Sequence, residues 1–136
     1  MKTTSLIIVT LAASFVAATG APAQTAMLPP ASTQAGVTYA TDIKPIFDVS
    51  CVKCHSGDKP KAHLKMDTLA GVLKGTKMGA VVKPGDSANS FLIQAVAHLT
   101  KDPDGWMPPM RNKAGIKTLT PEQVGLIRAW IDQGAK

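Results

Sequence analysis

The sequence predicts a small, mostly helical domain with long loops over residues 39–136, and three observations lead to this prediction. Apolar residues at helical spacing and helix-capping residues recur in several short segments. No run of alternating strands and no internal repeat is found along the chain. The loops are long for a chain of 136 residues, so side chains alone would form a thin core, and a large flat group is expected at its centre.

The first 23 residues have the layout of a secretory signal peptide. Lys2 gives a positive start, residues 6–18 form an apolar run, and Ala21 and Ala23 are small residues at the expected cleavage point. The apolar run is shorter than the roughly 20 residues of a membrane-spanning helix, so an uncleaved anchor is the less favoured alternative. We expect a bacterial protein that is periplasmic or otherwise exported, without stable membrane insertion after the signal is removed.

Residues 24–38 are uncharged and rich in Ala, Pro, Thr and Gln, which predicts a flexible leader that is disordered or extended. The first helix is expected after Tyr39, with Asp42 as its N-cap and Pro45 in its first turn. Its apolar positions have helical spacing and are Ile43, Ile46, Phe47 and Cys51.

A second, short helix is expected after Asp67 or Thr68 as its cap, with Gly75 near its end. Residues 80–82 form a brief apolar run that fits an extended segment.

A third helix is expected to start at Asp86 or Ser87, to carry apolar residues as far as Leu99, and to end before the Asp102-Pro103-Asp104-Gly105 turn. The last helix has the strongest pattern. Thr120-Pro121-Glu122-Gln123 is a capping box with proline at the first helical position, and Gly134 ends the apolar stripe.

The charge of the chain bears on its partners. Lysines and arginines number 15 against 9 acidic residues, for a net charge of +6. The basic residues are spread and not interleaved with aromatics, which argues against nucleic-acid binding. A diffuse positive surface suits docking to an acidic redox protein, although a soluble basic surface without a particular partner fits as well. We expect a monomer or a small subunit.

Both cysteines lie in one tetrapeptide, Cys51-Val52-Lys53-Cys54, and His55 follows directly. Two thiols at this spacing on a helical turn can reach the two vinyl groups on one edge of a porphyrin, and the next residue then directs its imidazole at the iron. The pattern is that of covalent haem c attachment. It predicts one haem, bound through Cys51 and Cys54, with His55 as the proximal ligand.

Three other readings of the cysteines compete. A thioredoxin-type dithiol site needs a strand–helix junction in a parallel sheet, which is not predicted here. A zinc site would need further ligands, and only His63 and His98 remain. A disulfide between the two cysteines would close a tiny loop and stabilise little.

The sixth iron ligand is predicted to be Met107. It precedes Pro108 and Pro109 in a loop far from His55, as a ligand on the opposite haem face requires, and the prolines stiffen that loop. Met110 is the rival. Met66 and Met78 fit hydrophobic packing better, and His63 and His98 fit surface or capping positions.

Several motifs occur in a fixed order over Tyr39 to Ala135. They are Asp42-Ile43-Lys44-Pro45-Ile46-Phe47, Cys51 to His55, Leu64-Lys65-Met66-Asp67-Thr68, Pro84-Gly85-Asp86 with Ser90, Met107-Pro108-Pro109, Leu119-Thr120, and Trp130-Ile131-Asp132-Gln133-Gly134-Ala135. This series resembles the planctomycete-type cytochrome c domain, a relative of class I cytochromes c.

The resemblance implies an all-α, class I cytochrome c-like domain wrapped around one covalent haem, with His55 and Met107 as axial ligands. It also implies that the first and last helices cross, with Phe47 and Trp130 as partners there. The sequence departs from the family at Ala62-His63, where the family often has two glycines.

Two functions from different classes follow. The favoured one is a one-electron carrier or small electron-transfer subunit, not an enzyme, because filled axial positions leave no open site for oxygen or peroxide. The alternative is a haem enzyme or gas-binding protein with an open sixth position. A third interpretation is a haem-free dithiol oxidoreductase.

Overall fold

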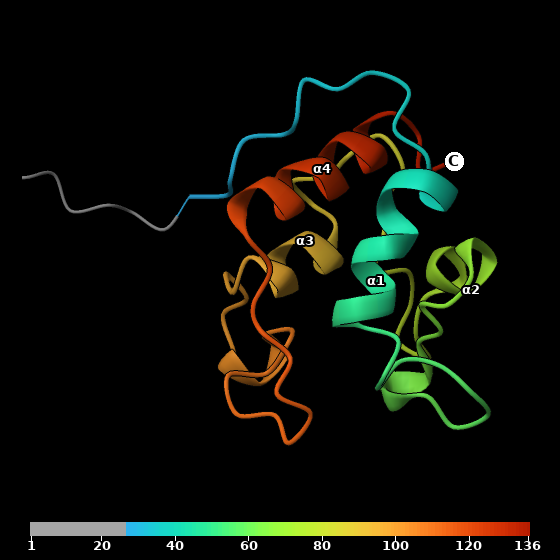
Figure 1. Ribbon diagram of the computed structural model, residues 1–136, viewed down its shortest axis with the longest axis vertical. Coiled ribbons are helices and arrows are strands. Elements are labelled where there is room, and N and C mark those ends of the chain that lie inside the picture. The colour runs from blue at the N-terminus through green and yellow to red at the C-terminus, as the bar shows by residue number, and fades with distance from the viewer. Residues whose placement is uncertain (1–26) are drawn as a thin grey trace, which may run out of the picture.

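The computed structural model describes residues 27–136 (Figure 1), so the signal peptide expected over residues 1–23 lies outside the described part. The described chain is all-α, as predicted, and has no strand beyond one isolated bridge between Thr76 and Gly79. Its elements are η1 (Tyr39–Ile43), α1 (Lys44–Ser50), η2 (Lys61–His63), α2 (Leu69–Lys74), α3 (Phe91–Val96), η3 (Pro103–Gly105) and α4 (Pro121–Asp132). None of these helices is both long and apolar enough to cross a bilayer.

The first helical segment begins earlier than predicted. Thr38, rather than Asp42, is its N-cap, and the Thr38 side chain accepts a hydrogen bond from the backbone N–H of Thr41. Asp42 lies within the first turn, where its carboxylate accepts the Thr38 N–H at 2.9 Å. The change from the π-helix η1 to α1 falls beside Pro45, which has no N–H to donate.

The third helix begins later than predicted. Asp86 and Ser87 shape the turn before it instead of capping it. The Asp86 carboxylate accepts the backbone N–H of Asn89, and the Ser87 hydroxyl donates to Asp132 in α4 at 2.9 Å. Because these side chains are already bonded, α3 starts only after Ser90, and it ends at Val96 instead of continuing to Leu99.

The other two helices follow their local signals. Thr68 caps α2, which ends at Gly75 with a positive φ of 76°. Thr120 and Gln123 form the predicted reciprocal capping box at the start of α4.

The core is centred on three aromatic rings where the first helical segment meets the last. Phe47 and Trp130 lie 6.4 Å apart at 87°, as the family resemblance implied, and Tyr39 lies about as close to both. The Tyr39 hydroxyl donates to the Met66 carbonyl at 3.0 Å. This contact joins the helix crossing to the chain that follows the cysteines.

Residues 27–38 have no regular secondary structure and run along α4. The Ser32 N–H donates to the Gly125 carbonyl in α4 at 2.9 Å, and Gln133 donates to the Gln34 carbonyl at 2.8 Å. A side chain at Gly125 would meet the Pro30 carbonyl at 2.6 Å, so only glycine allows this close approach.

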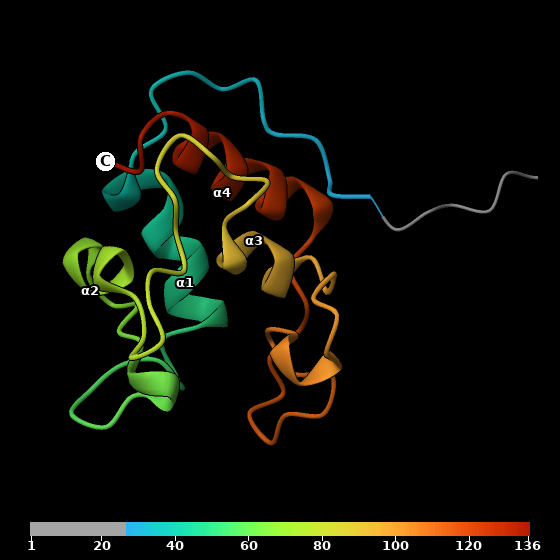
Figure 2. The same ribbon diagram turned by 180° about the vertical axis from the view of Figure 1, so that it is seen from behind.

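The arrangement of the elements leaves room for a site between two loops. In Figures 1 and 2, α4 crosses one end of the molecule, and α1 and α3 extend from it on opposite sides. The chain after α1 and the long loop after α3 continue toward the other end of the molecule. The two segments therefore face each other as two walls.

Candidate cofactor site

A cavity of about 230 Å³ lies between these two walls. It contains all four site residues predicted from the sequence: Cys51, Cys54, His55 and Met107. Its other lining is mostly apolar and consists of Ser50, Lys61, Ala62, Leu64, Met66, Thr76, Val81, Phe91, Leu92, Ala95, Val96, Pro108, Pro109, Asn112 and Ile116.

Three of the four residues share one turn at the end of α1. The backbone N–H groups of Cys54 and His55 both donate to the Cys51 carbonyl, at 3.1 and 3.0 Å. Cys51 is buried, Cys54 is half-buried, and both are free thiols. The turn therefore presents two thiols and an imidazole to the same cavity.

The protonation of Cys51 bears on the dithiol reading. Burial, with a smaller contribution from neighbouring Cys54, raises the pKa of the Cys51 thiol to about 12. Dithiol oxidoreductases depend on the opposite change, a lowered pKa that provides a thiolate. The environment of Cys51 thus disfavours thiol redox chemistry.

His55 is held in an orientation suited to a metal ligand. Its ring is buried, and its Nδ1–H donates to the Lys61 carbonyl at 3.1 Å, which leaves Nε2 as the free nitrogen. Burial lowers the pKa of His55, although hydrogen bonds to the Lys61 and Leu64 backbone act in the opposite direction. The ring is therefore kept neutral, the form that binds a metal.

Met107 reaches the cavity from the other wall. Its backbone N–H donates to the Ala95 carbonyl of α3 at 3.0 Å, and buried Pro108 follows it. The rival Met110 is 70% exposed and does not line the cavity. Met66 does line the cavity, but its N–H donates to the His55 carbonyl, so its backbone belongs to the same wall as His55.

His98 has a structural role that the sequence did not indicate. It was expected at a surface or capping position, but its ring stacks on Trp106 at 5.0 Å and 8°. Its Nε2–H donates to the Pro108 carbonyl at 3.2 Å. His98 thus fixes both neighbours of Met107. No local sequence motif predicts this contact, because it depends on the path of the loop that brings Trp106 and Pro108 back to His98.

The zinc reading finds no support in the geometry. His63 lies beside a different cavity, and His98 is engaged in the loop described above. Within residues 27–136, no group of three or more His, Cys, Asp or Glu side chains is placed to hold a metal ion.

A family model described as planctomycete cytochrome C matches residues 51–111, the segment that contains the two cysteines, His55 and Met107. The predicted resemblance is confirmed. A planctomycete cytochrome c domain is a haem-binding, c-type domain, and the donors in this cavity fit that group. They comprise two thiols on one turn, an imidazole with one nitrogen already bonded, and a thioether on the facing wall.

Two further comparisons concern solved structures and curated proteins. A solved structure of Kuenenia stuttgartiensis hydrazine synthase is similar over 73% of this chain, with 23% identity and a TM-score of 0.49. This chain covers only 16% of the length of that one. None of the curated proteins matches the chain.

Proposed function

We propose that the protein is an exported electron carrier that holds a single haem c and exchanges one electron at a time with a protein partner. The observation that carries this proposal is one apolar cavity with Cys51, Cys54 and His55 on one wall and Met107 on the other. Bound haem would supply an iron that alternates between the ferrous and ferric states, at a potential raised by a thioether ligand.

Each side chain has a distinct part in this proposal. Cys51 and Cys54 would hold the haem edge as thioethers, and His55 would bind iron through Nε2 while the Lys61 carbonyl fixes its ring. Met107 would occupy the sixth position, which leaves none free for oxygen or peroxide. The mostly apolar lining would limit the access of water to a bound haem.

The partner and the location are also proposals. The net charge of +6 favours an acidic docking surface on a redox protein. The signal-like N-terminus favours the periplasm or another exported location, where the protein would act as a monomer or as a small subunit.

The test is the absorption spectrum of haem-loaded protein, oxidised and reduced, with Met107→Ala beside Met110→Ala. We expect a low-spin spectrum for the wild type and for Met110→Ala. Met107→Ala should become high-spin and bind carbon monoxide, because the sixth position opens. Met110 is a matched control, since it lies three residues away but outside the cavity.

An unchanged spectrum for Met107→Ala would show that Met107 is not the ligand. Carbon monoxide binding by the wild type would favour the alternative, an enzyme or gas-binding protein with an open sixth position.

A further inference from the structure

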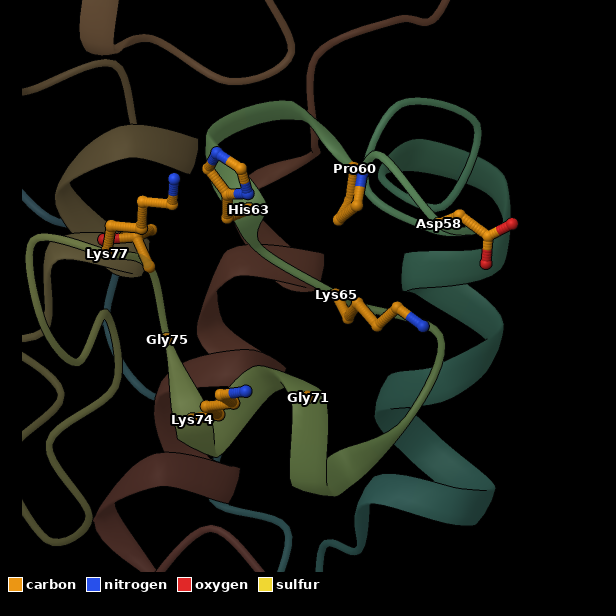
Figure 3. Close-up of a pocket in the computed structure, with 9 residues that line it drawn as sticks. Asp58, Pro60, His63, Lys65, Gly71, Lys74, Gly75 and Lys77 are labelled. Carbon is orange, nitrogen blue, oxygen red and sulfur yellow. The ribbon is translucent and has the colours of Figure 1, made fainter.

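A second cavity, of about 350 Å³, lies on the opposite side of the segment that begins at Lys61, whose carbonyl accepts the His55 Nδ1–H. It is formed by the segment around His63 and Lys65 together with α2 and the turn that follows (Figure 3). Its volume is within the roughly 300–1,000 Å³ of ordinary small-molecule sites. Neither the planctomycete cytochrome c match nor the proposed haem site accounts for it.

The lining of this cavity has more basic than acidic side chains. Lys65, Lys74 and Lys77 line it together with His63, and the only acidic lining residue is Asp58. In Figure 3, His63 and Lys77 lie on one side of the hollow with Lys74 below them, and Asp58 lies on the other side, with Lys65 nearer to it. These lysines form no ion pair, because the one salt bridge within residues 27–136 joins Lys44 and Asp48.

The spacing of these lysines is set by close backbone packing. A Cβ atom at Gly71 in α2 would lie 2.7 Å from both Cβ and the carbonyl oxygen of Lys65. At Gly75 it would collide with the backbone of Gly79. Gly71 lets α2 lie directly against the Lys65 segment, and Gly75 lets the end of α2 lie against the turn at Gly79, so that the lysines of both segments surround one hollow.

We propose that this cavity binds a small multivalent oxyanion, a compound with two or more carboxylate or phosphate groups. Several like charges around one concave surface repel one another, and a polyanion would relieve that repulsion while pairing with more than one lysine. A monovalent ion would pair with one lysine at a time and gain little at this exposed site.

The cavity also shares a wall with the proposed haem site. Along one short segment, Lys61, Leu64 and Met66 line the first cavity, while His63 and Lys65 line the second. The Lys61 carbonyl accepts the His55 Nδ1–H. A single backbone segment, from Lys61 to Met66, would therefore separate a bound anion from His55, the proposed iron ligand.

This position has a consequence that rests on the proposed function. Negative charge near the iron favours the ferric state, so the oxidised protein should bind the anion more tightly than the reduced protein. By linkage, the anion would lower the reduction potential by the matching amount.

The experiment is isothermal titration of the haem-loaded protein with citrate and, separately, with pyrophosphate, at constant ionic strength. We expect saturable binding of one anion per protein, and the tighter of the two ligands distinguishes a carboxylate site from a phosphate site. The variant Lys74→Gln/Lys77→Gln should weaken binding by about fivefold or more. A matched control, Lys113→Gln/Lys117→Gln, removes the same charge away from the cavity and should leave binding unchanged.

Absence of saturable binding with both anions, or equal weakening in the two double variants, would overturn the proposal. Titration of the ferric and ferrous forms tests the coupling, and equal affinities would overturn that part. The proposed function is tested separately, by the absorption spectrum. It would fail if the spectrum showed no haem or no change in Met107→Ala, and neither result depends on anion binding.

Discussion

His98 adopts a backbone conformation with φ of +57°, which is uncommon for a residue other than glycine. The stack on Trp106 and the hydrogen bond to the Pro108 carbonyl hold it in this conformation. Because these contacts lie on either side of Met107 in sequence, they determine where the thioether can point. The ligand loop thus depends on a residue that would not itself touch the iron.

We therefore expect His98→Ala to weaken Met107 ligation without abolishing haem attachment. The fraction of high-spin, carbon monoxide-reactive protein should rise. The free energy of unfolding should fall by about 1–2 kcal/mol, because the hydrogen bond and the ring stack are lost. Spectroscopy and denaturant unfolding measure the two effects.

The control for this prediction is His63→Ala, which removes an exposed histidine outside the Met107 loop. If His98→Ala reacted with carbon monoxide no more than His63→Ala, the positioning role of His98 would be wrong.

At the scale of elements, local signals predicted helices well when their caps were satisfied locally. The Thr120 capping box was recognised correctly, and Thr68 was one of the two caps that the sequence allowed for α2; both caps join residues three apart. Ser87 could not be assigned in this way, because its partner Asp132 is 45 residues further along. The basic cavity was missed for the same reason, since its lysines converge only when α2 packs against the chain at Lys65.

The site itself was predictable to the extent that it is a contiguous motif. Cys51, Cys54 and His55 lie within one turn, so their spacing alone predicted that they lie together. Met107 required an argument from loop stiffness, and the structure brings it into the same cavity. The contact of His98 with the residue after Met107 depends on the path of the loop, which no spacing rule describes.

The contact between Tyr39 in η1 and Trp130 in α4 leads to a prediction about stability at alkaline pH. Burial, and then the negative charges of Asp48 and Asp67, raise the pKa of Tyr39, the one tyrosine in the chain. The neutral phenol is therefore favoured by the folded state. This contribution to stability is present below about pH 10, the ordinary value, and is lost as the pH rises through the raised value.

Ultraviolet titration of the phenolate in haem-loaded protein measures this directly. Tyr39 should ionise at a higher pH in the folded protein than in the same protein unfolded by guanidinium. Equal midpoints in the two states would contradict the prediction.

At the scale of the whole molecule, the first cavity is a gap in a small core. The side chains around this cavity are mostly apolar, and without a group between them they face water instead of packing against one another. The total stability of a small domain is only about 5–15 kcal/mol. A group that covers this apolar surface therefore contributes substantially to the stability of the domain.

We expect Cys51→Ser/Cys54→Ser protein, which cannot attach haem, to lose most of its cooperative thermal transition. Circular dichroism of this variant beside the haem-loaded wild type measures the change. A variant that melted cooperatively within a few degrees of the wild type would show that the core is sufficient without a cofactor.

The two ends of the folded domain meet at one point. The backbone N–H of Tyr39 donates to the carbonyl of Lys136 at 2.8 Å, and the indole of Trp130 donates to the same oxygen. A chain that enters at residue 39 thus leaves beside its entry point. Residues 39–136 could therefore be spliced into a surface loop of a host protein through two short linkers from adjacent positions, at the loss of the contacts that Ser32 and Gln34 make with α4 and Gln133.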